Sequence, residues 1–128
     1  MAVGMVATVA VQSSSITTSL LVPMIAAGVL TIRNAFPVTL GANVGTTITA
    51  LLASLATENP AGLVIALHHI LFNAIGILIW YPLPALREIP LKMAAGLARL
   101  AEIRKSLVVA YVIGAFLVTP MIGVLLLQ

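Results

Sequence analysis

The fold is decided by the stretch Gln12-Ser13-Ser14-Ser15-Ile16-Thr17-Thr18-Ser19, a polar run inside otherwise apolar sequence. No side chain in the run is charged, and all except that of Ile16 can form hydrogen bonds. No charged residue occurs from Met1 to Ile32. Hydrocarbon cannot hydrogen-bond, so a polar run at membrane depth is costly unless it lines a cavity, a binding site or a helix contact. The run is therefore the first candidate for a functional site.

The composition is that of a membrane protein. Of the 128 residues, 62% are hydrophobic and 7% are charged, and the mean hydropathy is +1.23. Soluble domains carry about 25% charged residues, so we predict an all-α integral protein of the cell membrane with several crossings of the lipid bilayer. The chain has no cysteine, which excludes disulfides and thiolate metal sites. Most of its basic residues fall between Arg87 and Lys105, a pattern typical of a membrane surface and not of nucleic-acid binding.

The lengths of the hydrophobic stretches divide the chain into candidate membrane spans. A helix needs about 20 apolar residues to cross the hydrocarbon, and three stretches reach that length, namely 35–56, 61–81 and 106–127. Residues 1–32 contain two shorter apolar pieces on either side of the polar run. Their lengths fit a re-entrant helical hairpin with its tip at residues 12–15, and they fit a straight span with a polar stripe equally well.

A second polar segment, Gly41-Ala42-Asn43-Val44-Gly45-Thr46-Thr47-Ile48-Thr49, lies inside the first long span. Glycine costs roughly 1 kcal/mol relative to alanine in a helix interior, so its two glycines predict an interrupted transmembrane helix, which Asn34 would cap upstream. Interrupted helices offer N-terminal ends to anions and freed carbonyl groups to cations. The same glycine spacing also matches the small-residue motif of packed membrane helices, so binding and packing both stay open.

The segment 84–105 combines helical apolar spacing with basic residues, which indicates an amphipathic interfacial helix or a structured loop on the cytoplasmic side. Within it, Glu88 and Lys92 are four residues apart and can pair. Arg33 is two crossings away and should lie on the same side. The polar group His68, His69 and Asn73 fits hydrogen bonds between helices better than a metal site, because no carboxylate or cysteine accompanies it. No catalytic motif is visible, so we do not expect an enzyme.

The two polar segments, in this order and at this spacing, resemble the paired signature of the type II sodium-phosphate cotransporters. The resemblance continues through Thr49, through 69–73 and 76–81, and through 84–87. Members of that family carry two inverted-topology repeats, each with one segment of each kind. This chain has one of each and is similar to the second repeat. The resemblance implies about half of a transporter, and we expect a fragment that works with the other repeat, with pairing of two copies as the less favoured route.

The resemblance also implies a site. Phosphate would bind at Ser13, Ser14 and Ser15, and sodium would bind at Gln12, Asn43, Thr46 and Thr49. Ala42 departs from the family pattern, which has serine there, so a sodium ligand at this position would have to be a backbone carbonyl or another group. The implied function is sodium-coupled symport of inorganic phosphate, with Na⁺ as coupling ion and no cofactor. The alternatives are a sodium-coupled carrier of another anion and a non-transporting membrane subunit whose polar runs only pack helices.

Overall fold

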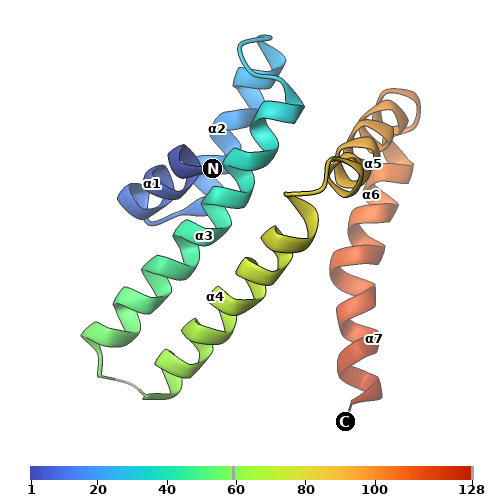
Figure 1. Cartoon of the computed structure of the whole chain (residues 1–128). Coiled ribbons are helices and arrows are strands. Elements are labelled where there is room, and N and C mark those ends of the chain that lie inside the picture. Colours follow the sequence, from blue (N-terminus) through green and yellow to red (C-terminus); the bar gives the residue numbers. More distant parts are fainter. Residues whose placement is uncertain (59, 128) are drawn as a thin grey trace. The chain divides into compact units, whose positions relative to one another are not determined.

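The structure is a computed structural model that describes residues 1–58 and 60–127, and every regular element in those residues is a helix (Figure 1). This confirms the predicted all-α class. The elements are α1 (Ala2–Val11), α2 (Ser14–Ala26), α3 (Ile32–Ala56), α4 (Pro60–Trp80), α5 (Pro84–Ile103), α6 (Lys105–Ile113), the π-helical turn η1 (Gly114–Val118) and α7 (Thr119–Leu126). The chain forms two compact units, Met1–Glu88 and Ile89–Gln128, which we describe separately.

Three helical stretches of the described residues are long and apolar enough to cross a membrane. They are Ile32–Ala56, Pro60–Trp80 and Lys105–Leu126, and they agree with the three expected spans within a few residues. The third stretch is continuous through η1, where the Thr119 hydroxyl donates a hydrogen bond of 2.8 Å to the Gly114 carbonyl. In the first unit α3 and α4 pack against each other as a helical hairpin (Figure 1).

The chain reverses direction between α1 and α2. Gln12 closes α1 in the left-handed conformation, with φ 55° and ψ 27°, and Ser13 is extended, with φ −150° and ψ 109°. The Ser13 hydroxyl oxygen then accepts a hydrogen bond from the Ile16 N–H at 3.3 Å and caps α2. Residues 1–32 therefore contain a helical hairpin and not a straight span. Its depth in a membrane stays a prediction.

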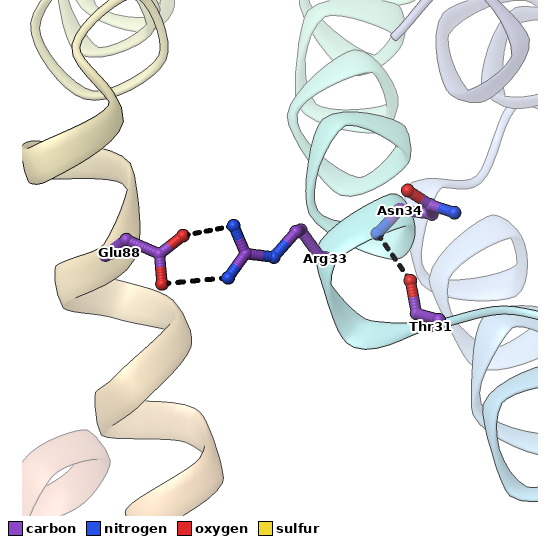
Figure 2. Close-up of polar contacts among 4 residues, drawn as sticks. All are labelled: Thr31, Arg33, Asn34 and Glu88. Carbon is purple, nitrogen blue, oxygen red and sulfur yellow. Dashed lines mark hydrogen bonds and ion pairs between the residues drawn. The ribbon is translucent and has the colours of Figure 1, made fainter.

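The start of α3 differs from the sequence prediction. Thr31 is the N-cap, since its hydroxyl oxygen accepts a hydrogen bond of 3.2 Å from the Asn34 N–H (Figure 2). Asn34, expected to be the cap, is instead the residue that is capped, because an N-cap side chain bonds the amide two or three residues ahead. The helix accordingly begins at Ile32, three residues before the predicted boundary at 35.

The predicted interruption at Gly41–Gly45 is wrong, because α3 runs unbroken from Ile32 to Ala56. Gly41 and Gly45 are buried, and both face α1 and the residue before it. A Cβ atom on Gly45 would lie 2.7 Å from the Thr8 Cβ and 2.8 Å from the Met5 carbonyl oxygen, and a Cβ atom on Gly4 would overlap the Val38 backbone. Close backbone approach, the packing alternative, is thus what these glycines provide.

An ion pair joins α3 to the beginning of α5. The two terminal nitrogens of Arg33 face the two carboxylate oxygens of Glu88, at 2.6 and 3.2 Å (Figure 2). Among the described residues Glu88 forms no ion pair with Lys92, the partner predicted from helical spacing. The Arg33 side chain is 63% exposed, and such pairs contribute only about 0–1 kcal/mol. The pair nevertheless puts Arg33 beside the start of α5, and their common side of the membrane stays a prediction.

The glycine contact between α1 and α3 makes a stability prediction. Gly45→Ala should lower the free energy of unfolding by roughly 1–3 kcal/mol, because the added methyl group forces α1 away from α3. Gly76→Ala is the matched control, since nothing lies within 4 Å of a Cβ atom there, and it should raise stability by up to about 1 kcal/mol. Unfolding in detergent, followed by circular dichroism, measures both. Equal stabilisation by the two substitutions would contradict the packing role of Gly45.

Candidate ion and anion site

The hairpin turn gathers hydrogen-bond donors at the start of α2. Ser13 uses its hydroxyl oxygen as an acceptor, which leaves its proton available for donation. Within the described residues, the hydroxyl groups of Ser14 and Ser15 have no hydrogen-bond partner. The first N–H groups of a helix also lack intrahelical acceptors and carry a partial positive charge. The three serines thus lie where an oxyanion would find both hydroxyl and amide donors.

A buried relay of threonine hydroxyls fixes this turn. The Thr8 hydroxyl of α1 donates to the Thr17 hydroxyl oxygen of α2 at 3.0 Å, and the Thr17 hydroxyl donates to the Ser13 carbonyl at 3.1 Å. Thr8 is 1% exposed and Thr17 is 5% exposed. Hydrogen bonds in so dry a place are costly to leave unmade, so the relay holds α1 and α2 in register beside Ser13.

The sequence does not single out Thr8. In the structure its side chain lies against Gly45 of α3 as well as bonding Thr17. It is an isolated threonine in an apolar helix, and no helical spacing relates it to Thr17. The polar run marked Thr17, but only the position of the turn reveals that Thr8 is its partner.

The proposed sodium residues of α3 present hydroxyl oxygens whose protons are already used. Thr46 donates to the Ala42 carbonyl at 3.1 Å, and Thr49 donates to the Thr46 carbonyl at 2.8 Å. A hydroxyl oxygen in such a bond keeps a lone pair, so it can still bind a hard cation. Because α3 is continuous, the freed backbone carbonyls expected from a broken helix are not available. Sodium ligands on this helix would therefore be side-chain oxygens.

Asn43 lies on the side of α3 that faces α4. The Asn73 side-chain amide approaches the Asn43 carbonyl oxygen at 3.5 Å, which is at the limit for a hydrogen bond. This contact agrees with the expected interhelical role of Asn73. His68 differs, because its Nδ1 lies 2.8 Å from the Val64 carbonyl of the same helix. The described residues contain no group of three or more His, Cys, Asp or Glu that could hold a metal ion.

The structure brings the hairpin against α3 but does not close a ligand shell. Gly4 lies beside Val38, and Thr8 lies beside Gly45, so α1 and α3 advance in the same direction. Gln12 follows Thr8 by one turn at the exposed end of α1. No hydrogen bond in the described part of the chain joins residues 12–15 to Thr46 or Thr49.

Comparison with known proteins shows extensive similarity. The profile of the Na⁺/Pi-cotransporter family matches residues 1–81. Sodium-dependent phosphate transport protein 2B of Homo sapiens is 48% identical over 93% of this chain and 18% of its own length. Sodium-dependent phosphate transport protein 2A of Rattus norvegicus is 45% identical over 94% of this chain and 19% of its own length. The chain thus spans less than a fifth of the length of these relatives. No solved structure matches it significantly.

Proposed function

The chain belongs to the Na⁺/Pi-cotransporter family, and on that premise we propose that it supplies one of two repeats that together carry out sodium-coupled phosphate symport. Its relatives are named as sodium-dependent phosphate transport proteins and not as enzymes. The observation that carries the proposal is the hairpin turn, where unpartnered serine hydroxyls lie at the start of α2. The other repeat is either part of the same longer chain or a second copy.

We assign the anion to Ser13, Ser14 and Ser15. Each offers a hydroxyl donor, and the α2 N-terminus adds amide donors with a favourable dipole. None of these groups carries a charge, so an empty site costs less in a membrane than a charged one would. The matching hairpin of the other repeat would supply the remaining donors.

We assign the coupling ion to side-chain oxygens of Gln12, Asn43, Thr46 and Thr49. Na⁺ is a hard cation and takes oxygen ligands. Its positive charge lowers the cost of holding phosphate near the middle of the membrane, which couples the two ions. The glycine contacts tie α1 to α3, so the hairpin and α3 would move together during alternating access, against a scaffold that includes Lys105–Leu126. In this arrangement α5 lies on the cytoplasmic side, supported by its basic residues.

A structural role explains part of the two polar runs. Gly41 and Gly45 are buried and allow the approach of α1, so these two residues serve packing. The Ser14 and Ser15 hydroxyls form no hydrogen bond among the described residues. Packing and capping therefore account for the glycines of the second run and for Ser13 of the first, and they leave the Ser14 and Ser15 hydroxyls without a structural role.

The anion assignment is tested by Ser14→Ala in proteoliposomes that contain this chain together with the other repeat. Loss of one hydrogen bond to a charged ligand costs roughly 1.5–3 kcal/mol, so the phosphate concentration for half-maximal uptake should rise between tenfold and a hundredfold. Ser19→Ala, an exposed serine of the same helix, is the control and should change nothing. Unaltered phosphate uptake by Ser14→Ala would refute the assignment. Uptake of a different anion, with phosphate ignored, would favour the second kind of carrier.

The sodium assignment is tested by Thr46→Val, which keeps the side-chain shape and removes the hydroxyl. One polar contact is worth about 1 kcal/mol, so the sodium concentration for half-maximal phosphate uptake should rise about fivefold. Thr39→Val is the matched control, because the Thr39 hydroxyl makes the same kind of backbone bond, to the Ala35 carbonyl at 3.2 Å. A sodium dependence that shifts equally in both variants would remove Thr46 from the ligand set.

A further inference from the structure

The second unit has an apolar groove between α5 and α6. Its volume is about 510 Å³, and it is lined mainly by Met93, Gly96, Leu97 and Leu100 of α5 and by Tyr111 of α6. The groove is open, since Met93 is 68% exposed and Tyr111 is 49% exposed. The proposed transport site uses none of these residues.

Basic residues lie close in sequence to those that line the groove. Lys92 lies one helical turn before Gly96, and Arg99 precedes Leu100 directly. Arg104 is extended, with φ −143° and ψ 90°, and this break between α5 and α6 leaves Arg104 and Lys105 at the junction of the groove's two walls. All four basic residues are exposed, and none forms an ion pair among the described residues. They outnumber the acidic residues of this unit, because Glu102 is the sole Asp or Glu in the sequence from 89 to 128.

One wall of the groove belongs to an apolar helix that begins at these charges. Lys105 begins the apolar stretch Lys105–Leu126. Tyr111 follows six residues later, about 9 Å further along the helix at 1.5 Å per residue. Basic side chains at the surface and apolar walls below them match the two parts of a phospholipid, whose phosphate stays at the surface while its acyl chains enter the hydrocarbon.

We propose that α5 and the beginning of α6 bind one anionic glycerophospholipid. Its phosphate pairs with Arg104 and Lys105 at the junction of α5 and α6, and one acyl chain lies in the groove against Leu97, Leu100 and Tyr111. The excess of positive charge selects an anionic over a zwitterionic headgroup, because each basic side chain near the surface strengthens binding to anionic lipid about fivefold. The proposal does not depend on the transport function.

The test measures lipid retention by the purified chain in detergent, using native mass spectrometry. The probes are phosphatidylglycerol and phosphatidylcholine with identical acyl chains. Wild type should retain phosphatidylglycerol at least fivefold better. Arg104→Gln should weaken phosphatidylglycerol binding about fivefold and leave phosphatidylcholine unchanged. Arg33→Gln removes the same charge from the other unit and should leave both unchanged. Equal retention of the two lipids, or equal loss in the two variants, overturns the proposal.

Gly96→Leu tests the groove itself. Nothing lies within 4 Å of a Cβ atom at Gly96, so the helix accommodates leucine, which circular dichroism checks, while its side chain fills the groove. Retention of both lipids should fall. Undiminished lipid binding in this variant, or competition by deacylated glycerophosphoglycerol as strong as that of the intact lipid, would show that the groove takes no acyl chain. In the assembled transporter, a photo-crosslinker in place of Met93 should label lipid; labelling of another protein segment would overturn the assignment.

Discussion

The close approach of α1 to α3 at Gly4, Gly41 and Gly45 is the constraint on which the rest of the first unit depends. All three glycines are buried, and at Gly4 and Gly45 a Cβ atom would be too close to α3 and α1 respectively. In hydrocarbon such contacts matter more than in water, because lipid tails solvate apolar side chains as well as another helix does. Dispersion and backbone proximity must then hold the helices together, and both require small residues at the crossing.

This contact fixes the candidate site one step at a time. It places Thr8 beside Gly45, and Thr8 donates to Thr17. Thr17 in turn donates to the Ser13 carbonyl and so holds the start of α2. The serines thus owe their position to a helix crossing that contains none of them. The proposed sodium oxygens of Thr46 and Thr49 lie on α3, close in sequence to the same glycines, which is a physical basis for coupling the two ions.

Much of the fold could be predicted because membrane burial follows composition and length. The three long apolar helices agree with the predicted spans within a few residues. The polar run leaves a hairpin and a straight span equally open, and the structure has the turn between α1 and α2. Errors arose where a residue's partner is distant in sequence. The sequence predicts a break at the glycines of α3 because glycine destabilises an isolated helix. It does not reveal that α1 packs against these glycines. Glu88 pairs with Arg33, 55 residues away, and a four-residue spacing cannot reveal that. The residue types of the candidate site are visible in the sequence. The hydrogen bond between Thr8 and Thr17 cannot be predicted from it, because the turn between α1 and α2 brings these two residues together.

The central claim is that the chain reverses at Gln12–Ser13 and so presents the serines at a tip. The most direct test is disulfide formation in the chain carrying Thr8→Cys and Thr17→Cys, which has no other cysteine. The two hydroxyl oxygens are 3.0 Å apart, so mild oxidation in membranes should cross-link the pair. In a straight helix residues nine apart are separated by about 13 Å along the axis, too far for a disulfide. The control pair Leu63→Cys and Phe72→Cys in the straight helix α4 should stay reduced. Rapid cross-linking of the first pair alone is the predicted result, and failure of that pair to cross-link would contradict the hairpin.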